Sequence, residues 1–160
     1  MKKLYFIFIV LFIICTPIFA DYNNRRSAGI SYSGGIYPTG YINGVNIDIN
    51  PFTVPLHLSF TANYLDSFSI QTNVSWRFFN QPLLGSISWY FGSGLGSEFF
   101  FDIEKYDIYT FAQAGLQVFP LDQIELFLEI KPDIGISFSQ NPIIFRGGVS
   151  FLIGSRFWFN

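Results

Sequence analysis

The chain has 160 residues, of which 50% are hydrophobic, 21% aromatic and only 12% charged. Soluble domains carry about 25% charged residues, so this composition argues against a surface that faces water on all sides. Eleven acidic residues outnumber nine basic ones and the net charge is −2, which argues against nucleic acid as a partner.

The first twenty residues have the pattern of a secretory signal peptide. Lys2 and Lys3 precede the apolar run Leu4–Cys15, and Ala20 closes the segment before a polar sequence. We predict cleavage after Ala20 and one mature domain over residues 21–160. An uncleaved helical anchor is the alternative, but the apolar run is short of the roughly 20 residues that a span needs. Lipidation at the chain's only cysteine is disfavoured, because two bulky isoleucines precede it.

The mature region contains eight stretches in which apolar and polar residues alternate with the period of a β-strand. Breaker sequences such as Asn80-Gln81-Pro82 and Asn141-Pro142 separate them. The predicted strands are 28–37, 44–50, 56–65, 68–79, 83–92, 106–119, 123–137 and 143–159. The number of segments is even, and most have a length close to the roughly 9 to 11 residues of a tilted membrane strand. Both features predict an all-β fold. We expect a closed antiparallel eight-stranded up-and-down transmembrane β-barrel.

The predicted strands have one apolar and one polar face. Strand 123–137 separates most cleanly, with Ile124, Leu126 and Leu128 opposite Glu125 and Glu129. A soluble lipocalin-type barrel would also alternate, with its apolar face around a ligand. The polar face here is mostly Ser, Asn, Gln, Gly and Thr, however, rather than the Lys and Glu of a hydrated exterior. This composition favours a polar lumen and an apolar exterior in contact with outer-membrane lipid.

Aromatic residues gather near the predicted strand ends, as in the interfacial girdles of membrane proteins. We predict that both mature termini face the periplasm. The periplasmic rim would then contain Phe52, Phe78, Phe79, Phe119, Phe157 and Phe159. The outer rim would contain Tyr37, Tyr41, Tyr64, Phe68, Trp89, Phe91, Tyr106 and Phe138. The outer loops would lie near 38–43, 66–67, 93–105 and 138–142, and only the third is long.

A family resemblance rests on the sequence before the last strand. The run Gly115-Leu116-Gln117-Val118-Phe119-Pro120-Leu121, followed by Phe127-Leu128-Glu129-Ile130-Lys131-Pro132, resembles a motif of small OmpA-like barrels. It is similar to an uncharacterised outer-membrane barrel family of spirochaetes and some other bacteria. The resemblance implies that aromatics of the last strand form a signal read by the barrel-assembly machinery. The residues that would serve are Phe151, Ile153, Phe157 and Phe159, although Asn160 follows the final aromatic.

Charged residues on the polar face would meet inside the barrel. The predicted ion-pair network comprises Asp48, Arg77, Asp107, Glu125, Glu129, Lys131, Asp133, Arg146 and Arg156. Because buried charges persist only when paired, we expect Arg146 and Arg156 to meet Glu125, Glu129 or Asp133. An eight-stranded interior is just wide enough for side chains to fill it, so a structural plug is favoured over a narrow ion path.

A surface-binding function would depend on the outer loop 93–105. Its candidate residues are Glu98, Phe99, Phe100, Phe101 and Asp102, since consecutive exposed phenylalanines can form an adhesive patch for an extracellular protein. The plainer alternative is that they extend the neighbouring strands above the membrane.

Catalysis has little support in the sequence. The only histidine, His57, precedes Ser59 in a pattern superficially similar to the His-x-Ser of lipid A deacylases. We expect this pair to lie on the inward face near the periplasmic end, away from the outer leaflet. No metal-ligand spacing, phosphate-binding loop or paired catalytic carboxylates occur, so we predict no catalytic residues, metal or cofactor. The predicted function is a mainly structural outer-membrane barrel, with surface binding as the alternative and a channel or a lipid-modifying enzyme as less favoured ones.

Overall fold

The computed structural model describes residues 28–37, 40–50, 56–64, 67–139 and 143–159. Several predictions lie outside these ranges: the signal peptide 1–20, Phe52, and parts of the loops near 38–43, 66–67 and 138–142. Within the described ranges, no helix is long and apolar enough to cross a membrane. The strands are β1 (Ala28–Tyr37), β2 (Gly40–Ile49), β3 (Leu56–Tyr64), β4 (Phe68–Leu84), β5 (Ile87–Phe100), β6 (Lys105–Leu121), β7 (Ile124–Phe138) and β8 (Ile144–Phe159).

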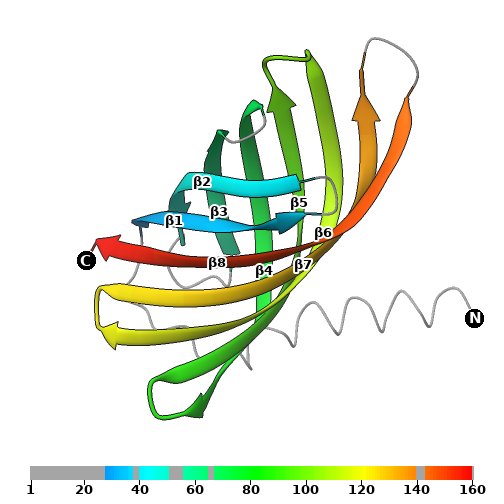
Figure 1. Cartoon of the computed structure of the whole chain (residues 1–160). Helices are drawn as coiled ribbons and strands as arrows, with labels where there is room; N and C mark the ends of the chain where they lie inside the picture. Colours follow the sequence, from blue (N-terminus) through cyan, green and yellow to red (C-terminus); the bar gives the residue numbers. More distant parts are fainter. Residues whose placement is uncertain (1–27, 38–39, 51–55, 65–66, 140–142, 160) are drawn as a thin grey trace, which may run out of the picture.

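The eight strands form a closed barrel in which each strand pairs with its neighbours in the sequence (Figure 1). All pairings are antiparallel, and β8 closes the ring against β1 from Ala28↔Phe159 to Ile36↔Phe151. Closure gives most backbone N–H and C=O groups a partner and removes most sheet edges. We call the end where β1 begins and β8 ends the proximal end, and the opposite end the distal end. The predicted fold class is confirmed.

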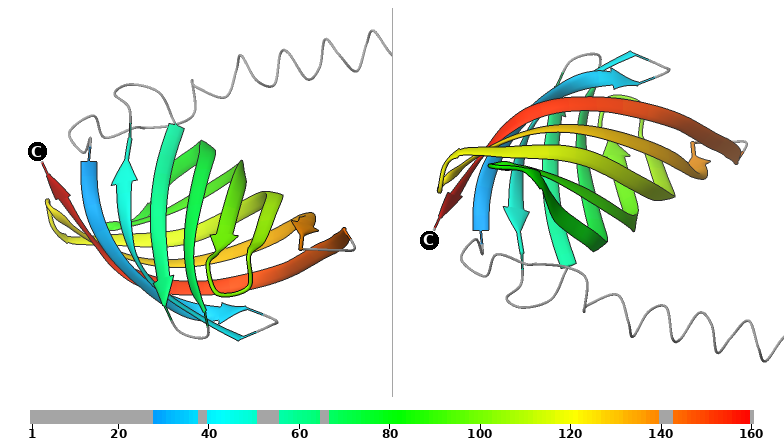
Figure 2. Two further views of the ribbon diagram at one scale, coloured as in Figure 1. Left: turned by 90° about the horizontal axis from the view of Figure 1, so that it is seen from above. Right: turned by 90° about the horizontal axis from the view of Figure 1, so that it is seen from below.

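The strands are strongly inclined, so that those of opposite walls cross in projection (Figure 2). The stagger is visible in the register. Ala28 of β1 pairs with Ile49 of β2. If each residue's partner on the next strand is followed in turn around the barrel, the path ends at Gly147 of β8. Gly147 lies beyond Phe151, the last residue of β8 that pairs with β1. Strand tilt and stagger are the geometric requirements for closing a sheet of this size.

Four predicted strand ends are wrong by four residues or more: β2 begins at Gly40 rather than 44, β4 ends at Leu84 rather than 79, and β5 is Ile87–Phe100 rather than 83–92. The predicted break at Asn80-Gln81-Pro82 lies inside β4, which has 17 residues and turns into β5 at Gly85, where φ is 56°. Proline is tolerated at sheet edges and bulges. Here β3 pairs with β4 only as far as Trp76, and the β4–β5 register shifts between Pro82 and Leu84.

The prediction of a long outer loop over 93–105 is also wrong, because the fifth strand begins and ends later than predicted. β5 continues to Phe100 and β6 begins at Lys105, so only a four-residue turn joins them. Phe99 pairs with Tyr106 and Phe100 with Lys105 at the distal end of this hairpin. Glu98, Phe99 and Phe100 extend β5, as in the plainer alternative, whereas Phe101 and Asp102 lie in the turn.

The two faces of the sheet separate as predicted. Large apolar side chains point outward along every strand, among them Ile47 (53% exposed), Leu128 (50%) and Ile153 (65%). Charged strand residues instead point into the barrel. Within the described ranges the only exposed charged residues are Asp102, Glu104 and Asp122, all of which lie in turns.

The shifted strand ends also move part of the aromatic rim. Trp89 and Phe91 were predicted at the outer rim, opposite Phe79. The structure instead packs Trp89 against Phe79, with ring centroids 4.4 Å apart, and Phe91 against Phe78 at 5.1 Å. These rings lie toward the proximal end because β5 begins there. The distal rim retains Phe68, packed on Phe101 at 5.1 Å, and Tyr106, which faces Phe138 at 6.4 Å.

Candidate functional site: the barrel lumen

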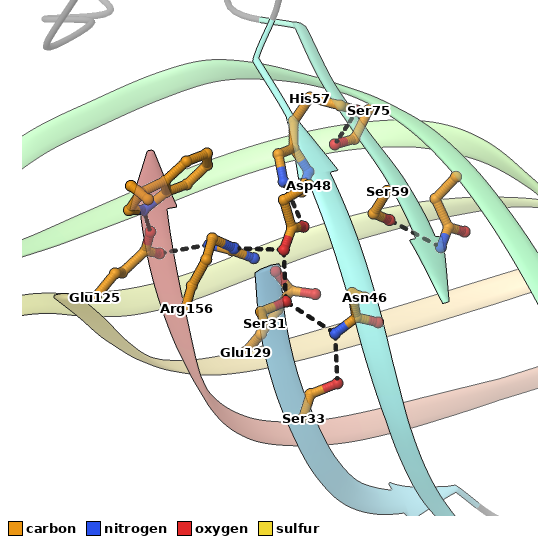
Figure 3. A network of polar contacts seen from close by, with 12 residues as sticks. Ser31, Ser33, Asn46, Asp48, His57, Ser59, Ser75, Glu125, Glu129 and Arg156 are labelled. Carbon is orange, nitrogen blue, oxygen red and sulfur yellow. Dashed lines mark hydrogen bonds and ion pairs between the residues drawn. The ribbon is translucent and has the colours of Figure 1, made fainter. Parts of the chain in front are cut away.

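A cluster of charged residues occupies the lumen near the proximal end, with Arg156 at its centre (Figure 3). Its Nη1 donates to Glu125 Oε1 at 2.7 Å, and its Nε lies 2.9 Å from Asp48 Oδ2. Glu125 also accepts a hydrogen bond from Trp158 Nε1 at 2.7 Å. Asp48, Glu125 and Trp158 are at most 1% exposed. The geometry therefore satisfies two buried carboxylates with one guanidinium and an indole, as buried charges require.

Asp48 connects this cluster to a row of short polar side chains. His57 Nε2 lies 2.9 Å from Asp48 Oδ1, and Ser31 Oγ donates to Asp48 Oδ2. Asn46 in turn donates to Ser31 at 2.9 Å and to Ser33 at 3.1 Å (Figure 3). We call Asp48, His57, Glu125, Arg156 and Trp158 the proximal cluster.

Arg77 and Tyr90 lie beside the proximal cluster. The Arg77 guanidinium carbon sits 4.3 Å from the centroid of the Tyr90 ring, and the Tyr90 hydroxyl donates to Glu129 Oε2 at 2.6 Å. Tyr90 is fully buried and Arg77 is 4% exposed. Together with the proximal cluster they fill this end of the lumen.

A second cluster lies toward the distal end and is organised by Arg146 of β8. Its Nη1 hydrogen-bonds Asp107 of β6 and lies 3.7 Å from Glu98 of β5, while its Nη2 is 3.4 Å from Asp133 of β7. Lys105 Nζ is 3.2 Å from Asp107. We call Glu98, Lys105, Asp107, Asp133 and Arg146 the distal cluster. It links four consecutive strands through one guanidinium.

Among the residues that the structure describes, five aromatic side chains are buried in the lumen, each directly opposite a glycine of a neighbouring strand. The register pairs are Tyr90↔Gly115, Tyr109↔Gly96, Phe111↔Gly94, Phe127↔Gly154 and Trp158↔Gly29. A Cβ at any of these glycines would lie 3.0 Å or less from the facing ring. The missing side chains therefore make the space that lets large rings enter a narrow barrel.

Each of these five rings has a cation over one face, and Arg156 lies over two of them, because its guanidinium carbon is also 5.2 Å from the Trp158 ring centroid. Arg77 covers Tyr90, Lys131 lies 4.0 Å from the centroid of Phe111, Arg146 lies 4.7 Å from Tyr109, and Arg156 lies 4.7 Å from Phe127. A cation over an aromatic face is attracted by the ring quadrupole, more strongly where water is excluded. The rings thus help to hold charged side chains inside the barrel.

The lumen is filled only in part, which corrects the expectation of a side-chain-filled interior. A cavity of about 530 Å³ extends from the proximal cluster to the distal cluster. Its β1–β4 wall carries hydroxyl and amide groups such as Ser59 and Asn73, whereas its β6–β8 wall carries rings and charges, including Phe111 and Lys131. The buried residues that the plug prediction requires, Glu125 and Arg156 among them, lie at the proximal end.

All nine residues of the predicted ion-pair network lie on the inward face. The expected pairs Arg156–Glu125 and Arg146–Asp133 form, whereas Glu129 meets Tyr90 instead of an arginine. Among the ion pairs of the described residues, none includes Arg77 or Lys131. Glu98 and Lys105 also form ion pairs in the lumen, and they are absent from the predicted network because the predicted loop 93–105 contains both.

The five residues of the predicted binding loop do not share one surface. Glu98 points into the lumen, where it accepts from Ser69 at 2.7 Å, and Phe100 lines the cavity. Phe99 and Phe101 point outward with centroids 4.8 Å apart. Asp102 accepts a hydrogen bond at 2.8 Å from the backbone N–H of Phe68 and so fixes the turn.

His57 and Ser59 have separate partners in the lumen. His57 contacts Asp48, while the Ser59 hydroxyl accepts a hydrogen bond from Asn73 at 3.3 Å. Within the described ranges, no group of three or more His, Cys, Asp or Glu side chains is placed to hold a metal ion.

The predicted assembly-signal residues share the outward face of β8. Phe151 is 53% exposed and Ile153 65%, and the rings of Phe157 and Phe159 pack edge to face at 5.5 Å. Their recognition by the assembly machinery stays a prediction.

No protein-family model and no curated protein matches the sequence. Among solved structures, the barrel is similar to the N-terminal β-barrel domain of Pseudomonas aeruginosa OprF, with a TM-score of 0.60 and 16% identity. That similarity covers 84% of this chain and 98% of the domain. Neisserial surface protein A (NspA) matches with a TM-score of 0.43 and 12% identity, over 82% of this chain and 94% of its own. The chain therefore has the fold of the OprF barrel domain.

Proposed function

We propose that the protein is an integral outer-membrane β-barrel whose main role is structural. One observation carries this proposal: on the described strands, charged side chains point into the lumen and large apolar side chains point outward. A soluble barrel needs the reverse arrangement, because its exterior must be hydrated. An apolar band on a closed antiparallel barrel suits lipid, where every backbone polar group must be satisfied within the sheet.

The proposed structural role rests on the filled proximal end. Arg156, Glu125 and Trp158 form a hydrogen-bonded floor, with Arg77 and Tyr90 packed beside it. An open water path through this end would require these buried partners to separate. The proposal therefore favours a closed barrel over a channel.

Export, the side of the membrane on which the termini lie, the assembly signal and family membership are further proposals that extend the structural role. The predicted signal peptide supports export, and strands that begin and end at the proximal end are compatible with both mature termini in the periplasm. The outward aromatics of β8, Phe157 and Phe159 among them, would serve as the assembly signal. Membership of the spirochaete-type family rests on the sequence motif alone. We propose no catalytic role for His57.

The proposal is tested by separating the membranes of cells that express the full chain. We expect the protein in the outer-membrane fraction, with a gel band that shifts on boiling because closed barrels stay folded in cold detergent. A protein with an established inner-membrane location and one from the periplasm serve as fraction controls. An unshifted band in the soluble periplasmic fraction would contradict the proposal.

A further inference from the structure

Two oppositely charged side chains of β7 stand next to each other on the cavity wall without pairing. Glu129 and Lys131 are two residues apart on the inward face, and both line the cavity. The ion pairs among the described residues do not join them. Each is instead held by an aromatic partner, Tyr90 in one case and Phe111 in the other.

Only one of the two carboxylate oxygens of Glu129 accepts a hydrogen bond from the protein. The residue is only 7% exposed, and its Oε2 accepts from the Tyr90 hydroxyl. Its Oε1 has no hydrogen-bond partner among the described residues. Because Glu129 lines the cavity, this oxygen is available to accept a hydrogen bond from a molecule bound there.

Lys131 is the complementary case. Its ammonium offers three donors. It rests on the face of Phe111, with Nζ 4.0 Å from the ring centroid, and no acceptor among the described residues receives its protons. The ring fixes the ammonium in place but does not satisfy its hydrogens. The Lys131 ammonium and Glu129 Oε1 therefore both keep hydrogen-bonding capacity for a molecule in the cavity.

The other charged residues of the cavity wall belong to the proximal and distal clusters, where they already pair with one another, and hydroxyl and amide groups line the space between them. On β3 and β4, opposite β7, Asn73 donates to Ser59 at 3.3 Å, and Gln113 of β6 reaches Ser75 of β4 at the same distance, so these groups satisfy each other. The volume of about 530 Å³ lies within the range of roughly 300 to 1,000 Å³ typical of small-molecule sites. A simple anion would satisfy Lys131 alone and a simple cation Glu129 alone, whereas a zwitterion satisfies both without adding net charge to a buried site.

We propose that the lumen cavity is a binding site for a small zwitterion of the free α-amino acid class. The ligand carboxylate accepts from Lys131 Nζ, and the ligand ammonium donates to Glu129 Oε1. Ser59, Asn73 and Gln113 line the space for its side chain. The distal cluster forms the mouth of the site, where Lys105 and Arg146 are already engaged by carboxylates. This inference goes beyond the structural role and is tested on the folded barrel.

Calorimetric titration of the purified full-chain protein in a non-ionic detergent tests the site, because a zwitterionic detergent would compete. The probes are L-serine, ethanolamine, which lacks the carboxylate, and 3-hydroxypropanoate, which lacks the ammonium. We expect saturable binding of L-serine, and affinities at least about tenfold weaker for the other two, because each loses one charge-assisted interaction. No saturable binding of L-serine, or equal binding of either analogue, would overturn the proposal.

Matched variants locate the site. Lys131→Met keeps the length of the side chain, and Glu129→Gln keeps an acceptor for Tyr90, so both leave the barrel's packing in place. Each is expected to weaken L-serine binding about tenfold or more. Asp122→Asn, which removes a charge in an exposed turn outside the cavity, is expected to change it by less than about threefold. A boil-shift gel confirms that each variant is folded. Unchanged binding in both Lys131→Met and Glu129→Gln would overturn the assignment.

Discussion

Arg156 on β8 reaches across β1 to contact Asp48 on β2, with Nε 2.9 Å from Oδ2, while its Nη1 holds Glu125 on β7. One side chain thereby joins three strands that surround the seam where the barrel closes. The contact lies in the lumen, where solvent screens it little.

Replacing Arg156 with methionine should therefore destabilise the barrel. The change leaves Asp48 and Glu125 as buried carboxylates without their cation, which costs about 3 to 5 kcal/mol when a buried pair is broken. Urea unfolding in lipid vesicles measures it. Arg146→Met is the matched control and should cost less, because the Arg146 side chain is 15% exposed against 5% for Arg156. An Arg156→Met barrel within about 1 kcal/mol of the parent would show that the proximal cluster does not stabilise the seam.

The aromatic–glycine pairs predict a specific steric cost. A Cβ on Gly115 would lie 2.5 Å from the Tyr90 hydroxyl oxygen, so Gly115→Val should destabilise the barrel by about 1 to 3 kcal/mol. Adding Tyr90→Ala should recover part of this loss in a double-mutant cycle. Gly147→Val is the control, because the nearest atom to its added Cβ is a backbone oxygen at 3.5 Å. Equal costs at the two glycines would contradict the account of lumen packing.

The filled proximal end predicts little ion conduction. In planar bilayers the parent protein should give no discrete conductance steps. The double variant Tyr90→Ala/Trp158→Ala should give such steps under the same conditions, because it removes two fully or nearly fully buried rings from the floor. Ile153→Ala, on the outward face, should behave like the parent. Steps of equal size in all three proteins would mean that the floor is not the barrier.

The faces of the strands were predictable because alternation is a local property. Each residue's parity decides its side, so Glu125 and Arg156 could be placed in the lumen without knowing which strands pair. Strand ends were less predictable. Pro82 and Gly85 are both residues that commonly end strands. Only the strand pairing shows that Pro82 lies within β4, beyond the part that pairs with β3, and that Gly85 forms the turn.

The lumen was predictable in its charges but not in its rings. Tyr109 and Phe127 stand on polar faces, where large rings are unexpected in a narrow barrel. The glycines that admit them, Gly96 and Gly154, lie on neighbouring strands, and their register cannot be read from one sequence. The cavity was missed for the same reason, since its size depends on how deeply the rings enter.

Single cysteines on β8 test most directly which face meets lipid. Ile153 is 65% exposed and points outward, whereas Ser150 is 4% exposed and lines the cavity. Ile153→Cys and Ser150→Cys, each labelled with a fluorophore in lipid vesicles, are compared with quenchers carried on lipid tails and quenchers dissolved in water. We predict strong lipid quenching at position 153 and weak lipid quenching at position 150. Lipid quenching confined to position 150 would mean that the apolar face encloses the lumen, and would contradict a membrane-spanning barrel.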